Sequence, residues 1–124
     1  MKLYICQKCG SLKYHDEKSD EKPICCGEVM SEVPIFEGDA SIEKHLPIYK
    51  FENNKAIVNV SDVEHPMIEE HFIQWIAIET ANGFKKKNLT SNDKPYAEFE
   101  LLENEKVIAA YAYCNLHGLW VANY

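Results

Sequence analysis

The sequence predicts an all-β protein with two parts, a small cysteine-rich metal-binding unit and an immunoglobulin-like sandwich of seven antiparallel strands. Three observations lead to this prediction. Four of the five cysteines lie in the first 26 residues. From His45 onward, short runs rich in Val, Ile, Tyr and Phe alternate with turn-forming residues. No segment sustains the 3.6-residue hydrophobic period of an amphipathic helix.

The first predicted unit covers residues 1–36. It holds a short apolar start (Leu3–Ile5), a polar stretch (His15–Lys22) and a second apolar piece (Val29–Ile35). A segment of this length cannot bury enough apolar surface to offset its chain entropy unless something cross-links it. A bound metal would provide that cross-link.

The second predicted unit covers residues 37–124 and begins with a linker, residues 37–44. The turn signals between its strands are Asn53-Asn54, Ala81-Asn82-Gly83, Ser91-Asn92-Asp93 and Glu103-Asn104-Glu105. The seven expected strands are Leu46–Phe51, Lys55–Val60, His71–Glu79, Phe84–Lys87, Tyr96–Leu102, Lys106–Tyr113 and Leu119–Tyr124.

Composition and charge narrow the function classes. The 124 residues are 46% hydrophobic and 27% charged, which is ordinary for a globular protein. The net charge of −7 disfavours a nucleic-acid-binding or anionic-membrane-binding surface. Lysine and glutamine interrupt the first residues too early for a signal peptide, and no apolar run is long enough to span a bilayer. We therefore expect a cytoplasmic protein whose cysteines are ligands or free thiols rather than disulfides.

The N-terminal cysteines have the spacing of a metal site. Cys6 and Cys9 form a Cys-x-x-Cys knuckle, and Cys25 and Cys26 complete a set of four thiolates. Such a set binds iron or zinc in a tetrahedron, and the spacing alone does not choose between them. Because Cys25 and Cys26 are adjacent, they cannot form a second regular knuckle, so we expect a distorted tetrahedron.

A second candidate site combines several histidines with the fifth cysteine. Cys114 and His117 flank a two-residue turn closed by Gly118, so both side chains can reach one metal. His65 and His71 do not share a helix face and would meet through a loop, and His45 lies near a strand end. Several imidazoles with one thiolate suit iron or copper better than a closed structural zinc site.

Three motifs match a known family. Glu43-Lys44-His45, His65-Pro66-Met67 with His71 following, and the segment from Cys114 to Trp120 resemble the superoxide reductases. The preceding cysteines resemble desulforedoxin, and the combination resembles the two-iron desulfoferrodoxins over essentially the whole chain. The resemblance implies a desulforedoxin-like Fe(Cys)4 domain followed by a neelaredoxin-like sandwich with an Fe(His)4(Cys) centre. Carried over by position, the first centre is Cys6, Cys9, Cys25 and Cys26, and the second has His45, His65, His71 and His117 equatorial with Cys114 axial.

The same resemblance implies an activity. It is the one-electron reduction of superoxide to hydrogen peroxide at non-haem Fe(II), without dioxygen production. Lys44 would steer the anionic substrate and hold a water that protonates the product. Glu43 would become the sixth ligand of the oxidised iron. The resemblance further implies a rubredoxin-like electron donor and a homodimer, and zinc or another metal can replace iron in recombinant protein.

Two alternatives remain from the residues themselves. A cupredoxin- or rubredoxin-like electron-transfer protein without its own catalysis would also use such ligands, although no methionine follows Cys114. A zinc-ribbon interaction domain would leave the four downstream histidines unexplained. Outside the ligand motifs, Trp120 is a candidate shield for the metal, Trp75 a core residue, and Lys85-Lys86-Lys87 a candidate docking patch for an acidic donor.

Overall fold

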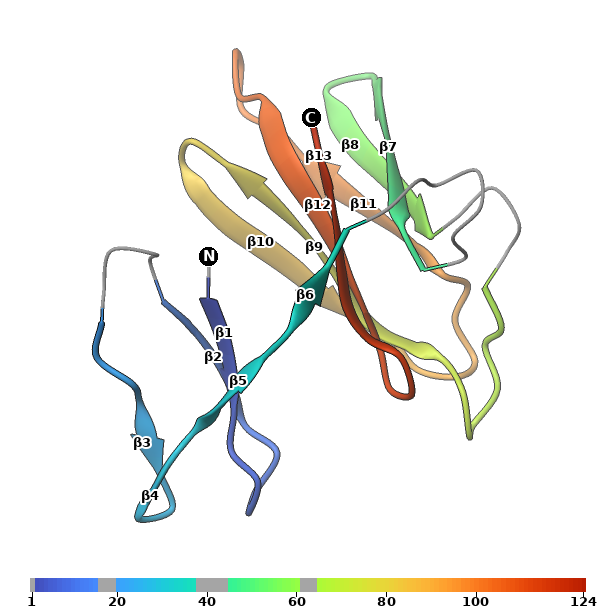
Figure 1. The fold of residues 1–124 in the computed structure, drawn as a ribbon. Coiled ribbons are helices and arrows are strands. Elements are labelled where there is room, and N and C mark those ends of the chain that lie inside the picture. Colours follow the sequence, from blue (N-terminus) through green and yellow to red (C-terminus); the bar gives the residue numbers. More distant parts are fainter. Residues whose placement is uncertain (1, 16–19, 38–44, 61–64) are drawn as a thin grey trace. The chain divides into compact units, whose positions relative to one another are not determined.

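A computed structural model describes residues 2–15, 20–37, 45–60 and 65–124 of the chain. The chain divides into two compact units, Met1–Pro34 and Ile35–Tyr124 (Figure 1). The described residues form strands, turns and loops without a helix, so the all-β prediction is confirmed. Accordingly, this part of the chain contains no helix with the length and apolar character needed to cross a membrane.

The first unit is built from short strands. β1 (Lys2–Ile5) lies between β2 (Leu12–His15) and β5 (Ser31–Val33) in an antiparallel sheet, and β3 (Ile24–Cys25) pairs with β4 (Glu28–Val29). Its buried cluster consists of Tyr4, Cys6 and Met30, with Cys25 packed against them. So small a core fits the expectation that this unit needs a cross-link.

The apolar piece Val29–Ile35, expected as one segment, is divided among three strands. β4 ends at Val29, β5 follows, and Pro34 separates β5 from β6 (Ile35–Phe36). Proline has no N–H to donate to a sheet ladder, which accounts for the break. β6 then pairs in parallel with β13 of the second unit, so Ile35 and Phe36 belong structurally to that unit.

The second unit contains two sheets, and all seven predicted strands are present (Figure 1). The five-stranded sheet has the order β10-β9-β12-β13-β6, and the three-stranded sheet has the order β11-β8-β7. The pairings are antiparallel except for that of β6 with β13. The strands are β7 (Pro47–Glu52), β8 (Lys55–Val60), β9 (Ile73–Thr80), β10 (Gly83–Asn88), β11 (Tyr96–Glu100), β12 (Val107–Cys114) and β13 (Gly118–Asn123).

The core lies between these two sheets. Alternate residues of a strand point to the same face, so Val58 and Val60 of β8 pack in one cluster with Ile76 and Ile78 of β9. Cys114, the last residue of β12, belongs to this cluster and is fully buried. The sandwich core therefore extends to one of the candidate metal ligands.

Two of the strand ends that differ from the prediction lie at candidate ligands. β9 begins at Ile73 rather than His71, because His71 pairs with Ile68 in a short hairpin. β12 continues through Cys114 instead of ending at Tyr113, with a register shift against β9 at this point. The pairing of β9 with β12 thus ends next to two candidate metal ligands, His71 and Cys114.

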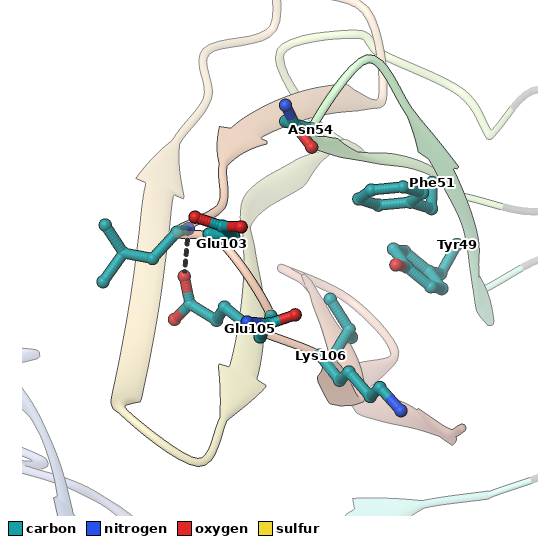
Figure 2. Close-up of a pocket in the computed structure, with 9 residues that line it drawn as sticks. Tyr49, Phe51, Asn54, Glu103, Glu105 and Lys106 are labelled. Atoms are coloured by element: carbon teal, nitrogen blue, oxygen red, sulfur yellow. Dashed lines mark hydrogen bonds between the residues drawn. The ribbon is translucent and has the colours of Figure 1, made fainter.

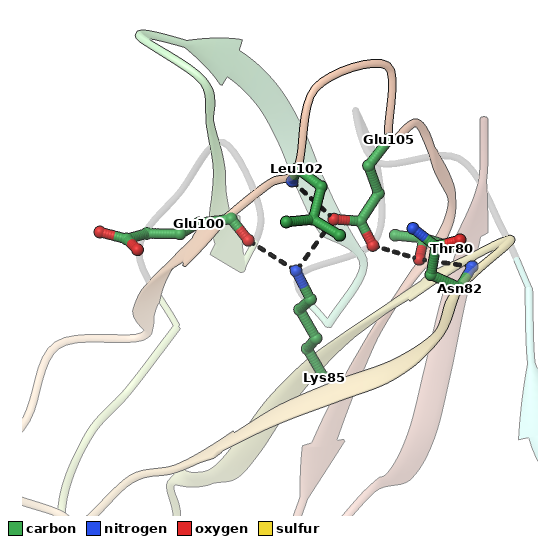
Figure 3. Close-up of polar contacts among 6 residues, drawn as sticks. All are labelled: Thr80, Asn82, Lys85, Glu100, Leu102 and Glu105. Carbon is green, nitrogen blue, oxygen red and sulfur yellow. Dashed lines mark hydrogen bonds and ion pairs between the residues drawn. The ribbon is translucent and has the colours of Figure 1, made fainter.

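A polar network fixes the loop between β11 and β12 (Figure 3). The buried carboxylate of Glu105 accepts hydrogen bonds from Thr80 Oγ1 (2.7 Å), Lys85 Nζ (3.0 Å) and the Leu102 N–H (2.9 Å). These bonds, the one from Thr80 first, lower the pKa of Glu105 to about 2. Lys85 also donates to the Glu100 carbonyl.

The lysine run on β10 is less open than its sequence suggests. Lys85 is engaged by Glu105, and the Lys86 ammonium lies 5.4 Å from the ring centroid of Trp75. Two of the three candidate docking charges therefore already have partners within the sandwich.

A cavity of about 520 Å³ lies beside the same loop (Figure 2). Tyr49 and Phe51 of β7 line it on one side, and Leu102 to Val107 line it on the other. None of its lining residues is a candidate metal ligand.

Candidate metal centres

Five candidate ligands of the second unit come together at one end of the sandwich. Their ligand atoms all lie within 4.8 Å of one another, although the residues span more than half of the chain. His45 precedes β7, Cys114 ends β12 and His117 lies in the turn before β13. The full set is His45, His65, His71, Cys114 and His117.

The two imidazoles from the loop before β9 have nitrogen atoms that need a partner. His65 is 2% exposed, and its Nδ1 lies 2.7 Å from the Pro66 carbonyl. A carbonyl only accepts, so Nδ1 carries the proton and Nε2 keeps its lone pair. The Nε2 atoms of His65 and His71 are buried without a hydrogen-bond partner among the described residues. A metal ion at the cluster would satisfy both atoms.

Burial also favours the neutral, metal-binding form of these rings. It lowers the pKa of His65 to about 4, an effect that the neighbouring imidazoles increase and the Pro66 carbonyl opposes. It likewise lowers the pKa of His71. A metal ligand must have a free lone pair, so both rings are in the protonation state that binding requires.

The remaining three ligands complete the cluster. His45 Nε2 and His117 Nδ1 lie 2.8 Å apart, and Cys114 Sγ is 3.7 Å from His117 Nδ1. Two imidazole nitrogens bound at about 2.1 Å and at right angles would be about 3 Å apart. The spacing of His45 and His117 therefore fits two adjacent ligands of one ion.

Neighbouring side chains hold this end of the cluster. Trp120 Nε1 donates to the His117 carbonyl (3.1 Å), and its ring stacks on His45 with centroids 5.1 Å apart. Trp120 also contacts Phe36 of β6, with ring centroids 5.1 Å apart. A β-carbon at Gly118, where φ is +88°, would lie 3.3 Å from Phe36. The sequence predicted a shielding role for Trp120, but gave no signal for Phe36, because β6 was assigned to the first unit.

The two other candidates next to His45 are not placed. Glu43 and Lys44 lie outside the residues that the structure describes. Their predicted roles therefore rest on the sequence. Trp75, the other tryptophan, is buried and stacks on Tyr113.

The four cysteines of the first unit form a separate cluster. Their Sγ atoms lie within 4.8 Å of one another. Cys9 and Cys25 are 3.6 Å apart, and Cys25 and Cys26 are 3.9 Å apart. Four sulfurs at about 2.3 Å around a tetrahedral ion would be separated by about 3.8 Å, whereas a disulfide requires about 2.05 Å. The geometry is that of a metal site.

Backbone turns aim these sulfurs. In the first knuckle the Cys6 N–H donates to the Ser11 carbonyl (2.9 Å) and the Gly10 N–H donates to the Cys6 carbonyl (2.8 Å). The backbone at the adjacent pair, Cys25 and Cys26, has a different conformation: Cys26 has a φ of +52° and the following Gly27 a φ of +77°. Left-handed backbone is uncommon at a non-glycine residue and is typical of strained functional sites. It turns Cys25 and Cys26 toward one point, whereas the distorted tetrahedron expected from their adjacency stays a prediction.

The crowded thiols influence one another. Hydrogen bonds, led by that with the Ser11 hydroxyl, lower the pKa of Cys9 to about 6. The neighbouring Cys9 in turn raises the pKa of Cys25 to about 12 and raises that of Cys26. Four thiolates cannot share this space without a compensating cation, which a bound metal would supply.

Comparison with known proteins identifies the family of this chain. The model of the family described as "Desulfoferrodoxin" matches residues 37–123. The chain belongs to the desulfoferrodoxin family. It is 37% identical over 120 residues to a "Desulfoferrodoxin homolog" of Archaeoglobus fulgidus, and the alignment covers 97% of this chain and 94% of that protein. It is 31% identical over 103 residues to a "Superoxide reductase" of Pyrococcus abyssi, covering 69% of this chain and 90% of that protein.

A solved structure extends the likeness to the fold. The superoxide reductase from Treponema pallidum superposes with a TM-score of 0.85 at 28% identity, covering 98% of this chain and 97% of that one. The predicted cofactors are therefore supported: the four-thiolate cluster and the cluster of four imidazoles and one thiolate match the two iron sites expected for a desulfoferrodoxin. A cupredoxin site uses two imidazoles, so the cluster of four argues against that alternative.

Proposed function

We propose that this chain is a superoxide reductase that converts superoxide to hydrogen peroxide at the cluster of His45, His65, His71, His117 and Cys114. The observation that carries the proposal is the convergence of four imidazoles and one buried thiol, two of the imidazoles with buried nitrogens that lack a partner. Relatives that carry the name superoxide reductase support it.

Iron at this cluster would supply the single electron that, with two protons, turns superoxide into hydrogen peroxide. The buried Cys114 thiolate and the four imidazoles would hold the iron. A thiolate ligand would donate electron density to the metal and so favour transfer of the electron to the substrate. Five protein ligands would leave room for a sixth, exchangeable ligand.

Exposure of the ligands indicates where superoxide enters. Cys114 is fully buried in the sandwich core and His65 is 2% exposed, whereas His117 is exposed and His45 half-buried. The cluster therefore has a buried side, formed by the thiolate, and a side open to solvent. A small anion reaches the site from the solvent side without a change in the sandwich.

Lys44 provides positive charge at the entrance to the site. Superoxide is an anion, the chain has a net charge of −7, and Glu69 and Glu70 are exposed beside His71. A local cation next to ligand His45 offsets this repulsion and raises the encounter rate, by about 10–1,000-fold in steered systems. Lys44 also holds the water that delivers a proton to the product.

Glu43 acts after the electron has left. Ferric iron is a harder acid than ferrous iron and prefers a carboxylate oxygen. Glu43 lies two residues before the proposed ligand His45 and would supply a carboxylate oxygen to the oxidised iron.

The first unit holds the second iron through Cys6, Cys9, Cys25 and Cys26. This gives a desulforedoxin-like domain and a superoxide reductase domain, which the sequence predicts as residues 1–36 and 37–124. Ile35 and Phe36, which pair with β13, go with the second of these domains. The protein is a cytoplasmic homodimer that takes electrons from a rubredoxin-like donor. The free, clustered thiols support a reducing compartment.

Metal analysis, an optical spectrum and a superoxide-consumption assay of the purified protein test the proposal together. We expect iron at both clusters, a sulfur-to-iron charge-transfer band from each, and consumption of superoxide that yields peroxide without dioxygen. Zinc alone after iron reconstitution would indicate an interaction domain. Iron that cycles with an electron donor but leaves superoxide untouched would indicate electron transfer without catalysis.

A further inference from the structure

Asn115 lies between the ligands Cys114 and His117, and the sequence motif gives it no role. Its side chain and main chain make three hydrogen bonds to the loop that carries His71. The Asn115 N–H donates to the Phe72 carbonyl (3.2 Å), and its Nδ2 donates to the Glu70 carbonyl (3.0 Å). In return the Phe72 N–H donates to Asn115 Oδ1 (3.0 Å).

These bonds extend the pairing of β9 with β12 beyond the point where the two strands end. β12 pairs with β9 up to Cys114 and Ile73, and the chain then turns so that His117 enters the cluster. Beyond this point the backbone of Asn115 provides one bond to Phe72, and its carboxamide provides the next acceptor and donor. A carboxamide carries both an acceptor oxygen and a donor NH2 group, so it can stand in for a peptide group.

The hydrogen bonds of Asn115 lie on both sides of the ligand His71 in the sequence. Glu70 and Phe72 are the two neighbours of His71, whose own backbone bonds are made to Ile68 (3.0 and 3.1 Å). The loop of His71 is thus closed on itself through Ile68 and joined to the Cys114–His117 turn through Asn115. The His71 and His117 rings, with centroids 4.9 Å apart, are held by two loops that Asn115 connects.

We propose that Asn115 is a positioning residue, which sets the distance between the His71 loop and the Cys114–His117 turn and so fixes three of the five ligands before iron binds. The inference rests on the proposed function, because it assumes that this cluster holds the iron. Partners that orient metal ligands typically change metal affinity by about 10–100-fold when they are removed.

Asn115→Ala tests the proposal, with Asn115→Asp as a graded variant and Leu116→Ala as a matched control. Leu116 is the next residue of the turn and is 61% exposed. We expect Asn115→Ala to release ferrous iron to a chelator about 10–100-fold faster than the parent. It should also shift the ferric sulfur-to-iron charge-transfer band, because Cys114 is held less firmly. Asn115→Asp keeps the acceptor for Phe72 but loses the donor to Glu70, so it should fall between them, and Leu116→Ala should match the parent.

Thermal unfolding with and without iron separates positioning from ordinary stabilisation. A residue that only stabilises the fold would lower the melting temperature of both forms equally. A positioning residue reduces the increase in melting temperature that iron loading produces. Equal loss in both forms, with parent-like iron release and spectrum, would overturn the proposal.

Hydrogen exchange in the unaltered holoprotein tests the contact even if Asn115→Ala fails to fold. The Phe72 amide should exchange slowly in the parent and in Asn115→Asp; fast exchange of this amide in the parent would refute the inference. A parent protein that takes no iron at the histidine cluster would instead refute the proposed function. Normal iron binding and activity in the parent, with an unchanged Asn115→Ala variant, would refute only the role of Asn115.

Discussion

The two metal clusters of this chain differ in what supports them. The four thiols of the first unit lie around a buried cluster of three residues, and two of them, Cys9 and Cys26, are exposed. The cluster of the second unit is placed at the end of a sandwich whose core includes Cys114 itself. In the first unit the metal must help to hold the fold, whereas in the second the fold holds the metal. Substitutions at each cluster should therefore have different consequences.

Cys114→Ser should cause the largest loss of activity. It removes the buried thiolate, so the rate of superoxide reduction should fall by at least about 100-fold, beyond the usual effect of outer partners. The sulfur-to-iron charge-transfer band of the second centre should disappear while that of the first remains. Stopped-flow kinetics and the ferric spectrum check this, and a variant with full iron, an unchanged band and a normal rate would remove Cys114 from the site.

Cys6→Ser should have the largest structural effect, confined to the first unit. The iron of the first unit should be lost and the amides of residues 1–34 should exchange faster, because this unit has little core of its own. The sandwich, its iron and most of the superoxide reaction should survive. If reaction stops while the second cluster is still loaded, the first iron is an obligatory relay and the modular comparison fails.

Lys44→Ala should slow the encounter with superoxide by about tenfold or more and leave the iron in place. Because the attractive charge is absent, added salt should slow the reaction less than it slows the parent. Lys50→Ala, an exposed lysine on β7, is the matched control. Identical second-order rates and salt dependence for both variants would show that Lys44 does not steer.

Glu105→Gln should lower the stability of the second unit without affecting either metal. The pKa of Glu105 is lowered from 4.5 to about 2, so its ionised form stabilises the fold fully above about pH 4.5. That contribution is lost as the pH falls through 4.5 toward 2. The melting temperature of the variant should be lower than that of the parent by on the order of 5 °C at neutral pH.

The difference in melting temperature between the parent and Glu105→Gln should shrink below pH 4.5. Glu103→Gln, which alters an exposed carboxylate in the same loop, should leave the melting temperature unchanged. A gap between parent and Glu105→Gln that stays constant down to pH 2 would contradict the role of the network.

Glu43→Ala should have the smallest effect on the superoxide step, because Glu43 is proposed to act only on the oxidised iron. Its effect should appear in the oxidised protein, which should bind azide or cyanide more tightly and have a shifted ferric spectrum. Titration of the ferric protein with these anions checks the expectation. Equal anion affinity in variant and parent would show that Glu43 is not the capping ligand.

Much of the sandwich was readable from local patterns. The alternation in Lys55–Val60 gave β8 with its observed bounds, and the turn residues placed the other strands to within two residues. The ends at His71 and Cys114 were misplaced, because the register shift near Cys114 and the pairing of His71 with Ile68 depend on contacts between segments. The hydrophobic alternation in a sequence indicates which face of a sheet a residue occupies. It does not indicate where the hydrogen-bonded pairing of two strands ends.

The sequence by itself determined the ligand types, their grouping by spacing into a thiolate site and a histidine site, and the family. Cys-x-x-Cys and Cys-x-x-His-Gly are local arrangements, set by a few residues of backbone. Tertiary structure decided what spans long distances: the approach of His45 to His117, the stacking of Trp120 on His45, the membership of β6 in the sandwich, and the bridge from Asn115 to the His71 loop. These contacts depend on how β9, β12 and β13 align, and that alignment is fixed by packing of the core rather than by any one segment.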